Sequence, residues 1–284
     1  MSGKQQVNSS ILRDRSLDKQ FKQDGFLRLP LFQQGQIDAL RLLYESTRLA
    51  HETVAKTNPF HSTQDTFDSE LIRHVDQEAK RILMPTVSAH FENYKVLTAN
   101  FLVKEIGPNS VLHPHQDWNF VDENEFFSFN IWIPLESTER SNGCLRFLAG
   151  SHKIVPTIRA NDNYVWAFQS IKDYLNELLV DVPTKEGECV LLNHSVIHGS
   201  WPNMGTQPRV ALVLGMCPAE APLRHFVSKD GKTVQEFGIT PELIVNLRKG
   251  ENPEGAPLLN SYAFEFPSVS IESFQKWMTE RSST

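Results

Sequence analysis

Two histidines and an aspartate have the types and spacing of a metal-binding set. His115 and Asp117 are separated by one residue, and His198 lies 81 positions beyond Asp117. On an extended segment, side chains two positions apart point to the same side, so His115 and Asp117 can chelate one ion. Two imidazoles and one carboxylate fill one face of an octahedral metal and leave three positions open, which suits Fe(II) and O2 chemistry. Zinc more often favours a tetrahedral arrangement.

Arg209 adds a carboxylate-binding group to this set. Its planar fork of N–H donors fits a carboxylate of a small ligand held beside the metal. Ser200, two residues after His198, can donate a hydroxyl to the same carboxylate. The residues therefore indicate a metal site with a clamp for an acidic co-substrate.

The motifs around these residues resemble the phytanoyl-CoA dioxygenase family of Fe(II)/2-oxoglutarate-dependent oxygenases. The similarity extends over roughly residues 20 to 217, and it includes a weaker match at Asp24-Gly25-Phe26-Leu27. The stronger matches are His-Pro-His-Gln-Asp-Trp (113 to 118), Asn-Ile-Trp-Ile-Pro-Leu (130 to 135), Asn-Gly-Cys-Leu-Arg-Phe-Leu-Ala-Gly-Ser-His-Lys (142 to 153) and His-Gly-Ser-Trp-Pro-Asn (198 to 203), with Arg209 at the family's offset.

The resemblance implies roles for seven residues. The iron ligands are His115, Asp117 and His198, and these are also the catalytic residues. Arg209 and Ser200 bind the distal carboxylate of 2-oxoglutarate, and Trp132 and Asn100 match positions that contact this co-substrate.

The implied reaction is hydroxylation of an unactivated C–H bond of a small-molecule metabolite. O2 is consumed, and succinate and CO2 are released. Related halogenases have a small residue where this chain has Asp117, so we expect hydroxylation, although desaturation or ring closure can arise from the same oxidant. Two other classes stay open: a non-catalytic jelly-roll protein that binds a ligand or metal, and a zinc hydrolase with the same three ligands.

Other histidines compete for the ligand roles. His194 precedes His198 by four residues, but only His198 has Ser200 and Arg209 at the family's offsets. His113 shares the parity of His115, yet no acid follows it two positions on, so we expect it to be solvent-facing or behind the ligands. His152, in Gly-Ser-His-Lys, is more typical of a turn-stabilising residue.

The acidic run Asp122, Glu123 and Glu125 closely follows the proposed metal-binding turn. A solvated loop is the ordinary interpretation of such a run. The alternative is a contact for an amine-bearing substrate. The chain has no basic cluster suited to a coenzyme A phosphate, which favours a small free metabolite.

Composition limits the class of protein. The chain has 284 residues, 40% of them apolar, and nothing demands more than one domain over 1–284. The net charge of −6 and the lack of Lys/Arg clusters argue against a nucleic-acid partner. No apolar run reaches the ~20 residues that span a bilayer, and residues 1–19 lack the hydrophobic centre of a secretory signal. Three widely spaced cysteines argue against a disulfide framework, so we expect a cytoplasmic protein.

The hydrophobic pattern predicts a mainly β fold with flanking helices. A polar segment (1–19) precedes a helical flank (20–95) in which Pro85 is expected to stop the second helix. Short strand-like runs spaced by turns then predict an antiparallel, cupin-like jelly roll, or double-stranded β-helix, over 96–217, with an inserted helix at 168–179. Residues 218–284 form a C-terminal extension that ends in a helix near Ile271 to Met278.

Overall fold

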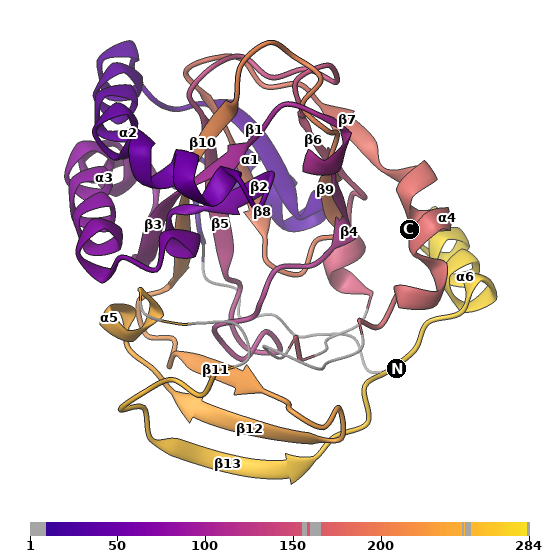
Figure 1. Cartoon of the computed structure of the whole chain (residues 1–284). Helices are drawn as coiled ribbons and strands as arrows, with labels where there is room; N and C mark the ends of the chain where they lie inside the picture. Colours follow the sequence, from indigo (N-terminus) through magenta and orange to yellow (C-terminus); the bar gives the residue numbers. More distant parts are fainter. Residues whose placement is uncertain (1–9, 155–157, 160–165, 246, 248–250, 283–284) are drawn as a thin grey trace.

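Two antiparallel sheets form the centre of the chain (Figure 1). The computed structural model describes residues 10–154, 158–159, 166–245, 247 and 251–282. The larger sheet has the order β1-β8-β5-β10-β3-β2, and the smaller has the order β4-β9-β6-β7. Their strands are β1 (Phe26–Pro30), β2 (Phe60–Ser62), β3 (Tyr94–Lys104), β4 (Leu112–His115), β5 (Phe129–Pro134), β6 (Leu145–Phe147), β7 (Val180–Val182), β8 (Glu188–Asn193), β9 (His198–Ser200) and β10 (Arg209–Pro218).

The larger sheet separates two apolar layers by strict alternation of its side chains. On β3, Ala99, Phe101 and Val103 point outward into the layer shared with the helices. The alternate residues of the same sheet point inward, toward the smaller sheet, and include Trp132 and Val213. Two facing antiparallel sheets of this kind confirm the expected jelly roll, and the inward positions are those that can line a site.

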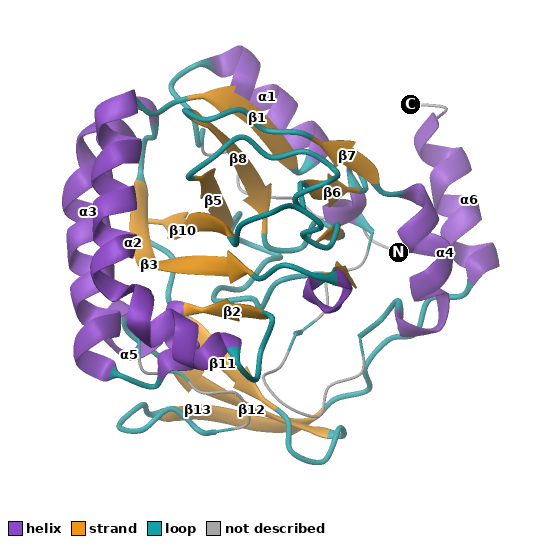
Figure 2. Cartoon of the chain, turned by 45° about the horizontal axis from the view of Figure 1, so that its top comes forward, coloured by secondary structure: helices purple, strands orange, loops and turns teal. Residues whose placement is uncertain are grey.

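Two long helices, α2 (Gln34–Ala55) and α3 (Ser69–His90), cover the outer face of the larger sheet (Figures 1 and 2). The expectation that α3 stops at Pro85 was wrong. Pro85 lies on the exposed face, where the carbonyl four residues earlier can bond to water instead of an amide. Leu83 and Val87 on either side are buried, and their packing keeps the chain helical through the proline.

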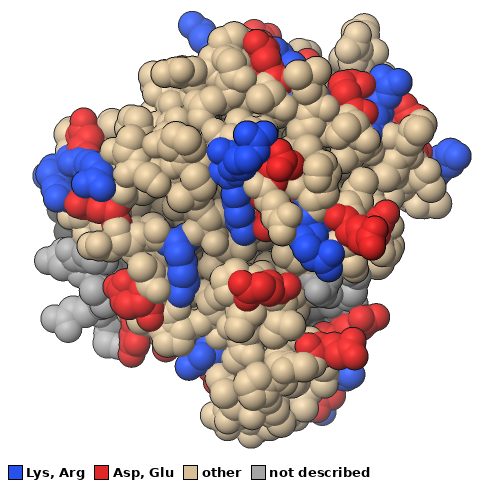
Figure 3. Space-filling model, turned by 90° about the vertical axis from the view of Figure 1, so that its left-hand side faces the viewer, with Lys and Arg blue, Asp and Glu red and all other residues tan. Residues whose placement is uncertain are grey.

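The face formed by α2 and α3 carries interspersed charges of both signs (Figure 3). Arg48 lies between Glu45 and Glu52 at helical spacing, and Arg81 pairs with Glu78. Exposed pairs of this type add little stability, so the apolar inner faces of these helices hold them on the sheet. No helix among the described residues is long and apolar enough to span a membrane.

Two further helices lie at the end of the smaller sheet. The insert expected at 168–179 is a short 3-10 turn (Gln169–Ile171) followed by α4 (Lys172–Leu178). The final helix, α6 (Ile271–Ser282), brings Phe274 into the same apolar cluster as Leu175, which confirms that this segment packs back on the core.

Several elements were not expected from the sequence, among them strands β1 and β2, which belong to the larger sheet although they lie in the segment taken as a helical flank. Helix α1 (Arg15–Asp24) begins inside the segment taken as polar, and its buried Asp18 accepts hydrogen bonds from the amides of Ile11 and Leu12. The C-terminal extension contains a third antiparallel sheet, seen at the bottom of Figure 1, with a short helix, α5 (Pro241–Ile244). Its strands are β11 (Arg224–Val227), β12 (Thr233–Gly238) and β13 (Leu258–Ala263).

Candidate metal centre

The smaller sheet places the two proposed histidine ligands side by side. His115 ends β4 and His198 begins β9, and the two are direct partners across the antiparallel pair. Their ring centroids are 4.2 Å apart. Gly199 allows this close approach, because a Cβ atom there would lie 2.7 Å from the carbonyl oxygen of Leu112.

Asp117 completes the cluster from the loop after β4. Its Oδ1 lies 3.5 Å from Nε2 of His115 and 3.7 Å from Nε2 of His198. One ligand atom from each of the three residues falls within 4.8 Å of the others, a grouping that can hold a metal ion. The structure therefore brings together all three residues expected to bind the metal.

Backbone carbonyls orient both imidazoles. Nδ1 of His115 lies 2.9 Å from the carbonyl oxygen of His113, and Nδ1 of His198 lies 3.0 Å from that of Val196. A carbonyl only accepts, so each Nδ1 carries the proton and each Nε2 keeps its lone pair for a metal. The two histidines thus present the correct nitrogen before any ion binds.

The charge states of the cluster also suit a divalent cation. Burial lowers the pKa of His198 to about 4, and the neighbouring His115 lowers it further. Burial alone would raise the pKa of Asp117, but His198 and His115 outweigh it and the net pKa is lowered. At neutral pH the site consequently offers neutral His198 and ionised Asp117, the forms that bind metals.

Arg209 and Ser200 lie on the same cavity as this cluster. Arg209 is buried, and its Nε and Nη1 have no hydrogen-bond partner among the described residues; the same holds for the hydroxyl of Ser200. Burial lowers the pKa of Arg209 to about 10, partly offset by Glu136, so the side chain stays charged at neutral pH. Buried donors without partners cost stability, which fits a site made for an anionic ligand.

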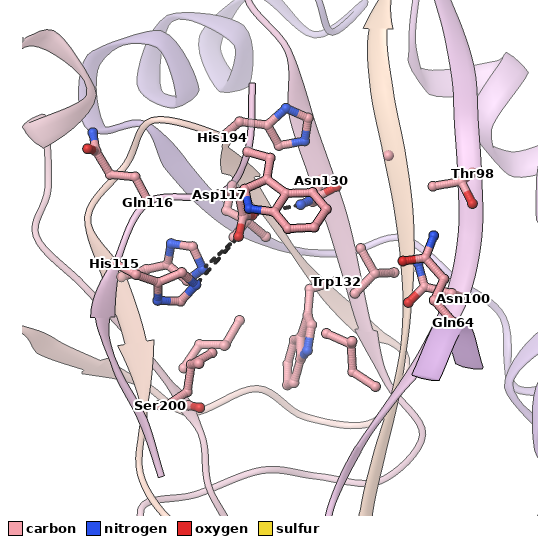
Figure 4. A pocket seen from close by; sticks show the side chains of 18 of the residues that line it. Gln64, Thr98, Asn100, His115, Gln116, Asp117, Asn130, Trp132, His194 and Ser200 are labelled. Atoms are coloured by element: carbon pink, nitrogen blue, oxygen red, sulfur yellow. Dashed lines mark hydrogen bonds and ion pairs between the residues drawn. The ribbon is translucent and has the colours of Figure 1, made fainter. Parts of the chain in front are cut away.

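The cavity has a volume of about 300 Å³. Trp132 lies in its wall with the Arg209 guanidinium 5.3 Å from its ring, and its contact with the co-substrate stays a prediction. Figure 4 shows Asn100 with Gln64 and Thr98 across the cavity from His115 and Asp117. Asn100 therefore faces the cavity, and its contact with the co-substrate stays a prediction.

The competing histidines lie outside the cluster. His194 lines the cavity, but its Nδ1 is 2.9 Å from the Ser128 hydroxyl. His113 is exposed. His152 is buried against Gly25, and its Nε2 lies 3.1 Å from the carbonyl oxygen of Lys22, which is a structural contact.

Sequence reasoning missed two residues that touch Asp117. Asn130 donates from Nδ2 to Asp117 Oδ2 at 2.8 Å. Arg159 donates from Nε to the backbone carbonyl of Asp117 and forms a buried ion pair with Glu123. Asn130 could have been found, because it has the inward parity of Trp132 on β5, whereas nothing local marks Arg159.

The chain is similar in sequence to proteins of a known family. Residues 21–211 match the model of the family described as phytanoyl-CoA dioxygenase. A phytanoyl-CoA dioxygenase of Arabidopsis thaliana is 29% identical over 138 residues, covering 48% of this chain and 45% of the relative. The phytanoyl-CoA dioxygenase domain-containing protein 1 of Danio rerio is 30% identical over 124 residues, covering 41% and 43%. The chain thus spans less than half the length of these curated relatives.

Solved structures share the fold. HygX from Streptomyces hygroscopicus, with nickel and 2-oxoglutarate bound, aligns with a TM-score of 0.51 and 16% identity over 72% of this chain and 87% of that chain. The epimerase SnoN, in complex with Fe3+, alpha ketoglutarate and nogalamycin RO, aligns with a TM-score of 0.52 and 16% identity over 91% and 96%. With the family match over most of its length, this chain belongs to the phytanoyl-CoA dioxygenase family of Fe(II)/2-oxoglutarate-dependent oxygenases.

Proposed function

We propose that this protein is an Fe(II)- and 2-oxoglutarate-dependent dioxygenase that hydroxylates a C–H bond of a small, uncharged metabolite. One observation carries the proposal. Three convergent metal donors and a buried arginine, with two of its nitrogens unpartnered among the described residues, line the same cavity. A protein that binds a metal without a co-substrate has no need of a buried arginine beside the metal donors.

Each residue has a separate task in this proposal. His115, Asp117 and His198 hold Fe(II) on one face and leave three positions open. Arg209 and Ser200 bind the far carboxylate of 2-oxoglutarate through donors that are otherwise unsatisfied among the described residues. When bound, iron, 2-oxoglutarate and O2 supply the oxidation, with succinate and CO2 as co-products. The protein orients both organic molecules and excludes water.

The lining of the cavity supports an uncharged substrate. Beyond the proposed iron ligands, Arg209 and Ser200, it combines aromatic and aliphatic groups with the imidazole of His194, neutral amides and one further hydroxyl. The amides and hydroxyl of Gln64, Asn100 and Thr98 can bind hydroxyl or carbonyl groups. Further lining residues are Phe60, Trp118, Phe120, Ile244 and Leu247.

The acidic run does not support an amine-bearing substrate. Glu123 is buried and its carboxylate is paired with Arg159. Asp122 and Glu123 line a second cavity of about 280 Å³ on the side of the C-terminal sheet. The one carboxylate lining the metal cavity, among the described residues, is the proposed ligand Asp117.

A turnover assay tests the proposal. Metal-free protein is reloaded with Fe(II), and succinate formation from 2-oxoglutarate is measured under O2 with a library of neutral metabolites, followed by mass spectrometry of the products. We expect Fe(II)-dependent succinate that increases with substrate, and a product heavier by one oxygen atom. A product lighter by two hydrogens would instead show desaturation or ring closure. Product formation that needs zinc but neither O2 nor 2-oxoglutarate would show a hydrolase.

Asp117→Ala provides the matched variant for this assay. We expect it to lose substrate-coupled succinate formation, because two imidazoles alone hold Fe(II) weakly. Asp122→Ala, an exposed acidic residue of the same loop, is the control and should retain turnover. Retained turnover in Asp117→Ala would contradict the assignment of the ligand.

A further inference from the structure

Within the described part of the chain, Asp117 is hydrogen-bonded at every polar atom except one carboxylate oxygen. Its amide donates to the carbonyl of His194 at 2.9 Å, and its own carbonyl accepts from Nε of Arg159. Oδ2 accepts from Asn130. Oδ1 is left, and it faces Nε2 of both histidines.

Asn130 is held in place independently of the loop that it contacts. It lies on β5, whose Cα partners at this position are Leu192 of β8 and Gly215 of β10, so it has a strand on each side. Its hydrogen bond to Asp117 crosses from the larger sheet to the loop after β4, as Figure 4 shows. A neutral amide donates to a carboxylate without adding charge beside the metal position.

The number of oxygens that Asp117 offers affects the chemistry. A carboxylate can bind a metal through one oxygen or through both. Two-oxygen binding would fill one of the three positions that 2-oxoglutarate and O2 need. We propose that Asn130 is a positioning residue that holds Oδ2 away from the metal, so that Asp117 binds through Oδ1 alone. This inference rests on the proposed function.

The test compares two affinities in the same variant. Asn130→Leu removes the donor at similar volume, and Asn130→Ala serves if the leucine variant fails to fold. Fe(II) binding to the metal-free protein is measured without O2, and 2-oxoglutarate is then titrated into the Fe(II)-loaded protein by its visible charge-transfer absorption. The control is Asn124→Ala, which removes an exposed amide from the loop between β4 and β5.

We expect the Fe(II) affinity and the 2-oxoglutarate affinity of the Asn130 variants to change in opposite directions or by very different amounts. Released Oδ2 adds a ligand atom, so Fe(II) affinity should stay the same or rise. The affinity for 2-oxoglutarate should fall by about 10- to 100-fold, a size similar to the loss of activity that follows removal of a group that orients a metal ligand. Asn124→Ala should change neither value more than about twofold, the scatter expected of a surface substitution.

Other outcomes would contradict either the inference on Asn130 or the proposed function. A parallel loss of both affinities would mean that Asn130 only supports the fold, and unchanged affinities would mean that it has no role; both overturn the inference. Wild-type protein that binds Fe(II) but not 2-oxoglutarate, or binds neither, would overturn the proposed function itself. The wild-type titration therefore separates the two failures.

Discussion

At the scale of single residues, Arg209 has the strongest structural link to an acidic co-substrate. It is fully buried beside Trp132 and has two N–H groups without a partner among the described residues. A buried charged group destabilises the folded protein unless an anion pairs with it. In the proposed function the co-substrate supplies that anion, so affinity for 2-oxoglutarate should depend on the shape of this side chain as well as on its charge.

Arg209→Lys should weaken 2-oxoglutarate binding by at least about tenfold, because a lysine cannot reproduce the two-pronged contact. Ser200→Ala should have a smaller effect of about 3- to 10-fold, equivalent to one hydrogen bond. Titration of the Fe(II)-loaded protein without O2 measures both. Ser228→Ala is the control, since its hydroxyl is equally buried and unpartnered among the described residues but lies outside the cavity. Wild-type affinity in Arg209→Lys would remove Arg209 from the site.

The sequence points to the proposed metal ligands and to Ser200 because the motifs that contain them are local. The spacing of His115 and Asp117, and of His198 and Ser200, places each pair on one side of an extended segment. The parity of Asn130 with Trp132 predicts that its side chain points inward, but its partner Asp117 lies 13 positions away on another element, so no spacing rule predicts their contact. Positioning residues are therefore the part of such a site that needs a structure.

At the scale of elements, the pattern predicted the jelly roll better than its attachments. Strands that face two apolar layers have long apolar runs, as β10 does, and are easily found. Strand β13 is mostly exposed, and β12 is only partly buried, so their weak alternation gave no signal. Helix α3 continued through Pro85 because tertiary packing outweighed a local rule.

The loop that carries Asp117 is held by Arg159, a contact that sequence reasoning could not predict. Arg159 contacts the Asp117 carbonyl, and Asn119 accepts a hydrogen bond from the amide of Arg159. The guanidinium donates through Nη1 to Glu123 at 2.9 Å. This buried pair joins two residues that are 36 positions apart in the chain.

Arg159→Met should destabilise the protein by about 3 to 5 kcal/mol, because it leaves Glu123 buried without its partner. The double variant Arg159→Met/Glu123→Gln should recover part of this loss, since no charge is then left in the interior. Urea unfolding of the metal-free proteins gives the free energies. The matched control is Arg81→Met, an exposed helix pair expected to change stability by less than about 1 kcal/mol. An equal loss of unfolding free energy in the two arginine variants would show that the buried pair contributes no more to stability than an exposed pair.

At the scale of the whole molecule, the fold buries imidazoles that have no role at the metal. His51 on α2 and His61 on β2 are each about 1% exposed, and their ring centroids are 5.3 Å apart. Nδ1 of His61 lies 3.0 Å from the Asn58 carbonyl, and Nε2 of His51 lies 3.5 Å from the Thr63 hydroxyl. The carboxylate of Asp65 raises the pKa of both histidines and so opposes the effect of burial. The pair joins the helical layer to the edge of the larger sheet.

This burial predicts how global stability depends on pH. Burial lowers the pKa of His51 from 6.5 to about 4, with a further decrease from His61, and burial also lowers the pKa of His61. Below pH 6.5 the unfolded chain binds protons that the folded protein does not, so the folded state loses stability as the pH falls toward 4. The loss from His51 alone is on the order of 3 kcal/mol across this window.

Urea unfolding of the metal-free protein at several pH values between 7 and 4.5 measures this loss. His51→Gln should be less stable at pH 7 but should show a flatter decline below pH 6.5, because its side chain does not titrate. His74→Gln, an exposed histidine on α3, is the control and should follow the wild-type slope. An unchanged slope in His51→Gln would mean that other groups, such as buried His225, whose pKa is also lowered to about 4 by burial, determine the acid sensitivity. The proposed metal ligands can then be studied at neutral pH, where His51 and His225 are uncharged in the folded protein.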